Sequence, residues 1–121
     1  MPLLRRDLAN PLVPNVAKDA SANATDEQFQ AGAATIRFIK AVTGSSVAHL
    51  KGWDLLAAGC TPGSNTPDFA WQFPASTTTT LVFMESVHEF STALTMAATS
   101  AAGTSASSNP AQTFAVTVGW E

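Results

Sequence analysis

Residues that could carry out chemistry are few in this chain of 121 residues, and they are scattered along it. The only histidines are His49 and His88, and the run Glu85-x-x-His88-Glu89 resembles half of a carboxylate metal site. That motif needs helical geometry and a second copy, whereas this segment has the pattern of a junction between two strands. We therefore expect no metal site and interpret the run as a polar turn.

Other catalytic arrangements are equally hard to find. Cys60 has no base beside it in the sequence and sits in a Gly/Pro-rich loop, which argues against a nucleophilic or redox role, and a single cysteine excludes an intrachain disulfide. Nucleophile elbows, phosphate-binding glycine loops and zinc frameworks are absent. Four carboxylates could form a glycosidase pair, but solvated turns explain them as well: Asp54, Asp68, Glu85 and Glu89. We expect no enzyme and no cofactor.

The three tryptophans offer one candidate ligand contact. Trp71 and Trp120 lie on strand faces that they share with Phe and Val, which is typical of a core. Trp53 lies between Gly52 and Asp54 and is the least constrained of the three. A module that recognises host-surface glycan through Trp53 and the loops at 59–67 and 99–110 is therefore one functional hypothesis.

Charge is scarce and unevenly placed. Charged residues make up 12% of the chain, against roughly a quarter in average soluble proteins, and small neutral residues replace them. Such surfaces suit protein–protein contact or a crowded lattice, and they also occur in ordinary extracellular-type β domains rich in Ser and Thr. Of the net charge of −3, residues 1–18 contribute +2 and residues 19–121 contribute −5. An acidic body argues against nucleic-acid binding.

Alternating apolar residues predict an all-β fold. Period-two patterns cover residues 35–42, 47–56, 69–73, 77–87, 90–98 and 114–120. The turn Gly44-Ser45-Ser46 makes a hairpin of the first two strands plausible. Short strands at regular spacing predict an antiparallel β-sandwich or barrel of about six to eight strands. We assign residues 29–121 to this body.

Residues 1–28 have a different pattern, and we assign them to an extended N-terminal arm and linker. Prolines at positions 2, 11 and 14 disfavour a helix, and the apolar residues between them follow no period. A segment that keeps its leucines but lacks regular structure usually gains order by docking on a partner. No apolar stretch has the length of a signal peptide or a membrane span, so we expect synthesis in a cytoplasm and no membrane contact.

The C-terminal third carries a resemblance. The stretch Phe90-Ser-Thr-Ala-Leu-Thr-Met-Ala-Ala-Thr99, the neutral loop after it and the strand Phe114-Ala-Val-Thr-Val-Gly-Trp120 resemble small β-sandwich structural proteins of tailed bacteriophages. The strand at 47–56 and the loop ending Asn65-Thr-Pro67 fit the same layout, so the resemblance covers about residues 33–121. Where that pattern has a glycine, this chain has Ala93. The resemblance implies a virion component made in the host cytoplasm.

Together with the arm, the resemblance implies a capsid cement (decoration) protein that binds the major capsid protein and forms trimers or similar clusters. The predicted partner-binding residues all lie in the arm: Leu3, Leu4, Arg5, Arg6, Leu8, Leu12 and Val13. Fully extended, an arm of about 28 residues spans on the order of 90 Å at roughly 3.3 Å per residue, enough to reach neighbouring subunits of a shell. A tail, neck or baseplate component is the alternative within the same class.

Overall fold

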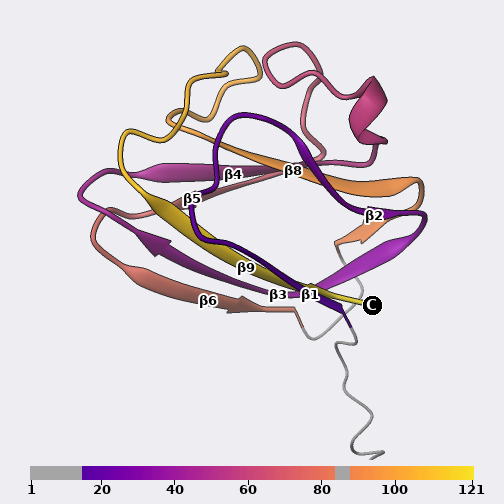
Figure 1. Ribbon diagram of the computed structural model, residues 1–121, viewed down its shortest axis with the longest axis horizontal. Coiled ribbons are helices and arrows are strands. Elements are labelled where there is room, and N and C mark those ends of the chain that lie inside the picture. Colours follow the sequence, from indigo (N-terminus) through magenta and orange to yellow (C-terminus); the bar gives the residue numbers. More distant parts are fainter. Residues whose placement is uncertain (1–14, 84–87) are drawn as a thin grey trace, which may run out of the picture.

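The protein is an antiparallel β-sandwich, as the sequence predicted. The computed structural model describes residues 15–83 and 88–121, which hold nine strands and one short 3-10 helix, η1 (Ala57–Gly59). Two sheets pack face to face (Figure 1). The first has the order β1 (Asn15–Asp19), β9 (Phe114–Trp120), β3 (Ala34–Thr43), β6 (Thr78–Val82), with β7 (Glu89–Phe90) also paired to β3. The second has the order β2 (Glu27–Ala31), β8 (Ala93–Thr99), β4 (Ala48–Trp53), β5 (Phe69–Phe73).

The core lies between the inner faces of the two sheets. Alternation along β3 and β9 turns every second residue inward, and paired inward residues such as Ile39 and Val118 are fully buried. Leu50 and Met96 meet them from the second sheet. Trp120 joins the sheets, because its Nε1 donates a hydrogen bond to Gln30 Oε1 at 2.9 Å. The predicted core role of Trp120 is thus confirmed.

The predicted hairpin between the strands at 35–42 and 47–56 is wrong. These segments form β3 and β4, which belong to different sheets, so the turn at 44–46 carries the chain across the sandwich. Residues 74–77 hold this crossing in place. The backbone N–H of Thr43 donates to the carbonyl oxygen of Thr77 at 3.0 Å, and Ser76 N–H donates to the carbonyl oxygen of Gly44.

The predicted boundary at residue 28 is also wrong, because residues 15–28 belong to the sandwich. β1 pairs along its whole length with β9, and β2 begins at Glu27 and pairs with β8. Sequence patterns missed both strands because each contains only one large apolar residue, Val16 in β1 and Phe29 in β2, and therefore shows no alternation. In β1 the small Ala17 faces inward while Val16 faces solvent, which hides the alternation.

Loops cover the outer face of the second sheet (Figure 1, top). Six outward-facing residues of β4 and β8 are therefore buried: His49, Lys51, Trp53, Thr95, Ala97 and Thr99. Lys51 Nζ donates to the carbonyl oxygens of Gly103 at 2.7 Å and Ala106 at 3.2 Å, which ties down the loop after β8. The Cys60 side chain packs with Trp53 and Ala97 in a small second core beneath these loops.

Asp54 fastens the end of β4 to the turn between β7 and β8. Its carboxylate accepts four hydrogen bonds, from the backbone N–H groups of Ser91, Thr92 and Ala93 and from the Ser91 hydroxyl, at 2.7–3.1 Å. Partial burial raises the pKa of Asp54, but the hydrogen bonds outweigh it and hold the pKa below its ordinary value. The charged form is therefore part of the folded structure.

We predict that Asp54→Ala lowers the free energy of unfolding by about 2–3 kcal/mol at pH 7, because several charge-assisted hydrogen bonds are lost. The lowered pKa makes this stabilisation present at neutral pH and removes it as the pH falls through that pKa, so native protein and variant converge in acid. Urea unfolding monitored by tryptophan fluorescence measures both effects. The control is Asp26→Ala, whose carboxylate accepts no hydrogen bond from the described residues; an equal loss in both variants would contradict the role of Asp54.

A second prediction concerns the seal over the second sheet. Burial, and secondarily the charge of Asp26, raises the pKa of the Cys60 thiol to about 11. Compared with an ordinary cysteine, the thiolate fraction at pH 8 then falls on the order of 100-fold. We expect Ellman's reagent to react with native protein at least about 100-fold more slowly than with urea-unfolded protein. Because Cys60 is the sole cysteine, the assay needs no variant; equal rates would show that the loops do not seal this face.

Candidate protein-binding face

Among the described residues, no loop covers the outer face of the first sheet in a comparable way. Its outward-facing side chains form three rows that cross the strands in register. The first row is Val16, Gly119, Phe38 and Val82; the middle row is Lys18, Thr117, Lys40 and Thr80; the third row is Ala115, Val42 and Thr78. We call these eleven residues the outer face. In Figure 1 the first sheet forms the lower layer of the sandwich, on the side away from the loops at the top.

Apolar side chains on the outer face are unusually exposed. Val16, Val42 and Val82 have exposed fractions of 58%, 40% and 62%, and they are three of the five large exposed hydrophobic side chains among the described residues. Phe38, half-buried, lies between Gly119 and Val82 in the first row. Covering the exposed part of one valine contributes on the order of 1 kcal/mol. The outer face therefore offers a partner several kcal/mol of favourable burial.

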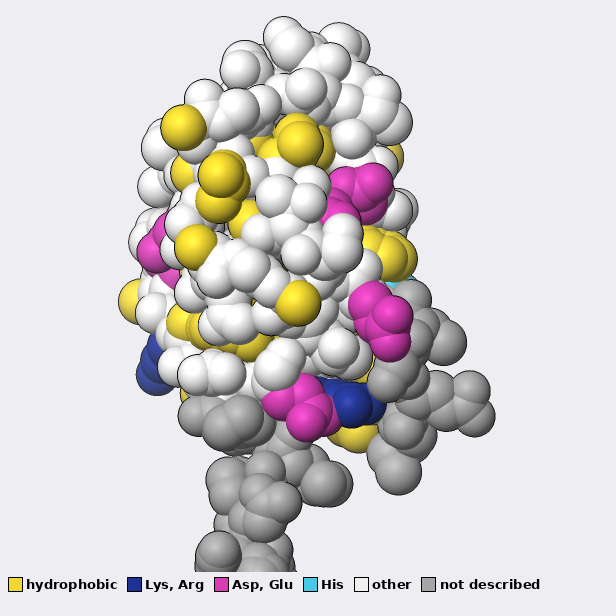
Figure 2. Space-filling model, turned by 90° about the vertical axis from the view of Figure 1, so that its right-hand side faces the viewer, with side chains coloured by type: hydrophobic (Ala, Val, Ile, Leu, Met, Phe, Trp, Pro, Cys, Tyr) yellow, Lys and Arg dark blue, Asp and Glu magenta, His cyan; other side chains and the backbone are white. Residues whose placement is uncertain are grey.

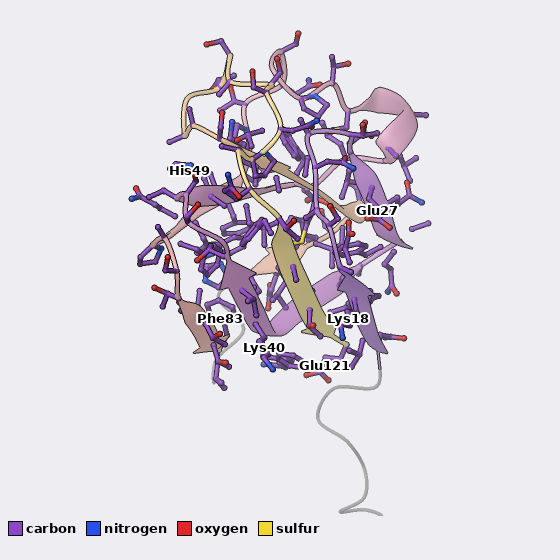
Figure 3. All side chains as sticks on the ribbon, turned by 60° about the vertical axis from the view of Figure 1, so that its left-hand side comes forward. Lys18, Glu27, Lys40, His49, Phe83 and Glu121 are labelled. Carbon is purple, nitrogen blue, oxygen red and sulfur yellow. The ribbon has the colours of Figure 1, made fainter. Side chains whose placement is uncertain are left out.

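The outer face is also where the accessible positive charge gathers. Lys18 and Lys40 flank Thr117 on neighbouring strands, about 10 Å apart at the usual strand spacing. Both are labelled at the lower side of the molecule in Figure 3. The other two described cations are occupied, since Arg37 pairs with Glu121 and Lys51 is buried. In the side view of Figure 2 the basic side chains lie in the lower part, whereas acidic ones are spread more widely.

All seven predicted partner-binding residues lie outside the described residues: Leu3, Leu4, Arg5, Arg6, Leu8, Leu12 and Val13. The structure nevertheless locates the point where their segment joins the body. β1 begins at Asn15, and its next residue, Val16, opens the first row of the outer face. Residues 1–14 are therefore attached at the edge of this face.

Trp53 is not available to a ligand, so the prediction of a glycan contact at this residue is wrong. Its side chain is 1% exposed, and its Nε1 donates to the carbonyl oxygen of Asn65 at 2.9 Å. The flanking Gly52 and Asp54 suggested an open position, but the cover comes from the loop that follows. Trp71 is half-buried at the margin of the core, where it stacks on Phe69.

The histidines and carboxylates are placed apart from one another or already engaged. His88 packs edge-on against the rings of Phe69, Trp71 and Phe83, and burial lowers its pKa. Asp54 and Glu89 line one shallow hollow, yet both Asp54 oxygens accept hydrogen bonds from the β7–β8 turn. Asp68 is engaged as well, because its Oδ2 accepts a hydrogen bond from the backbone N–H of Asp54 at 2.6 Å. Glu85, the fourth candidate, lies outside the described residues.

Two general searches of the described residues give negative results. They contain no group of three or more His, Cys, Asp or Glu side chains arranged to hold a metal ion. Within residues 15–83 and 88–121, no helix has the length and apolar character needed to cross a membrane.

Comparison with protein-family models finds no matching family, and comparisons with curated proteins and with solved structures find no match either. What indicates the function is therefore the residues of this chain and the sheet face that its described segments leave uncovered.

Proposed function

We propose that this chain is a non-enzymatic structural protein of a virion, namely a capsid cement protein that binds the lattice of the major capsid protein. One observation carries the proposal: the described loops bury the outer face of one sheet, while no described segment covers the outer face of the other, which carries exposed valines and two accessible lysines. The resemblance to structural proteins of tailed bacteriophages supports a virion as the place where this chain acts. The binding surface comprises the outer face and the N-terminal segment attached beside it.

The chemistry of the outer face specifies its partner. Exposed valines lower the free energy of the complex when a partner covers them, and lysines beside them select a surface that carries carboxylates. Arg5 and Arg6 give the N-terminal segment the same sign of charge. A protein that binds only the assembled shell stabilises that shell by mass action. The proposed partner is thus an acidic, partly apolar surface that repeats over the capsid.

The first test compares variants of the outer face with a matched control. Val16→Glu and Lys40→Glu should each raise the Kd for capsids of the same virus at least about tenfold, because a charge is buried or reversed at the contact. Leu56→Glu is the control, since Leu56 is exposed to a similar degree (47%) but follows β4 on the loop side. Co-sedimentation measures the binding. Equal binding by the Val16 and Leu56 variants would sink the proposed role of the outer face.

The second test removes the N-terminal segment. Deletion of residues 2–14 leaves β1 intact and should weaken capsid binding on the order of 100-fold, because the predicted contacts of four leucines and two arginines are lost together. Unchanged co-sedimentation would show that residues 2–14 do not contribute to capsid binding. The variants of the outer face would then decide whether that face binds the capsid. Counting copies per virion then separates cement, present in hundreds of copies, from a neck or baseplate component, present in a few.

A further inference from the structure

β6 forms an open edge of the first sheet. It is the last strand in the order β1-β9-β3-β6, and only β3 pairs with it among the described residues. The N–H of Thr43 donates to the carbonyl of Thr77, and the N–H of Phe83 donates to the carbonyl of Arg37. Antiparallel ladders alternate, so residues 77, 79, 81 and 83 bond to β3. Thr78, Thr80 and Val82 therefore direct their backbone N–H and C=O groups away from it.

Nothing in the sequence of β6 protects this edge. The strand reads Thr78-Thr79-Thr80-Leu81-Val82, with no charge, proline or glycine and with four β-branched residues. The edges on the far side of the sandwich differ. β1 carries Lys18 and Asp19, and β2 carries Glu27 and an irregularity between Gln28 and Gln30. Charges and bulges of this kind prevent strands of other molecules from adding to an edge.

The three open residues of β6 are complementary to themselves. In an antiparallel pair of two β6 strands centred on Thr80, Thr80 faces its own counterpart and Thr78 faces Val82 of the partner subunit. Each of the three facing pairs exchanges two N–H···O=C bonds, so this register forms six backbone hydrogen bonds. A shift by two residues in either direction loses one facing pair. The register centred on Thr80 is therefore the best available.

We propose that β6 pairs antiparallel with β6 of a second copy of this chain, so that the first sheets of the two copies form one continuous sheet. The two-fold axis that relates the copies passes between the two Thr80 residues. Charge permits the pairing. Lys40, next to Thr80 on β3, and its counterpart lie three strand spacings apart, about 14 Å. This separation exceeds the screening length of about 8 Å at physiological salt.

The pairing goes beyond the proposed function, because the dimer forms without any capsid. It also extends the outer face, since the open residues of β6 carry outer-face side chains. The first row would continue through Val82 into Thr78 and Val42 of the partner subunit. Two linked faces bind a repeating surface more tightly than one face alone. A two-fold dimer differs from the trimer that the phage resemblance implies, so the mass in solution separates the two.

The test uses the mass of the full chain and a site-specific cross-link. Native protein should have twice the 12.6 kDa mass of one chain at micromolar concentration. Cys60 is buried, so Thr80→Cys introduces one accessible thiol, on the two-fold axis. Mild oxidation should cross-link Thr80→Cys at least about tenfold faster than Thr78→Cys, whose counterpart is displaced along the strand. β5 forms the edge of the second sheet and is also uncharged, so it is the alternative place for a contact between copies. Equal cross-linking rates in Thr80→Cys and Thr78→Cys would place the contact away from β6.

Disruption of the edge completes the test. Thr80→Lys brings two like charges together on the axis and should give monomers with an unchanged circular dichroism spectrum. Thr80→Val, which keeps a β-branched side chain, should remain dimeric. A native mass of one or three chains, or a dimer that survives Thr80→Lys, would overturn the proposal. Val16→Glu should leave the mass in solution at two chains, so a loss of capsid binding and a loss of the dimer are distinguished from each other. If Thr80→Lys fails to fold, the rate of cross-linking of Thr80→Cys decides whether the dimer forms.

Discussion

Two packed sheets have four faces, and the described part of this chain covers three of them. The inner faces cover each other through Ile39, Leu50, Met96 and Val118. The outer face of the second sheet is closed by the loops that follow β4 and β8. No described segment remains to cover the outer face of the first sheet, whose valines stay in solvent. This uncovered sheet face is the surface that we propose for binding.

The closed face depends on polar anchors, because the loop after β8 is made mostly of Ala, Gly, Ser and Thr and has little apolar surface to bury. Lys51 places its ammonium group beneath this loop and donates to the carbonyls of Gly103 and Ala106. Burial lowers the pKa of Lys51, because removing the charged ammonium group from water is unfavourable. The buried lysine thus serves the fold, and the lysines left for recognition, Lys18 and Lys40, lie on the opposite sheet.

Sequence patterns predicted most strands of this fold but little of the binding face. Alternation identified β3, β5, β8 and β9, because one side of each strand meets the core and the other differs from it. All six residues of β4 are buried, so its pattern could not say that loops cover its outer side, and Trp53 was misassigned for that reason. The turn residues at 44–46 predict that the chain reverses direction, but they do not indicate whether the next strand joins the same sheet or the other one.

The sign of the charge connects the outer face to the N-terminal segment. If that segment folded back over the outer face of its own body, Arg5 and Arg6 would approach Lys18 and Lys40, and like charges would oppose the contact. The same repulsion acts between the segment and the outer face of a sister chain. An external surface with carboxylates satisfies both sets of cations at once. Because the segment joins the body beside Val16, both can reach such a surface together. This arrangement favours a foreign acidic partner for the segment, while the proposed dimer joins sister chains at the uncharged edge of β6.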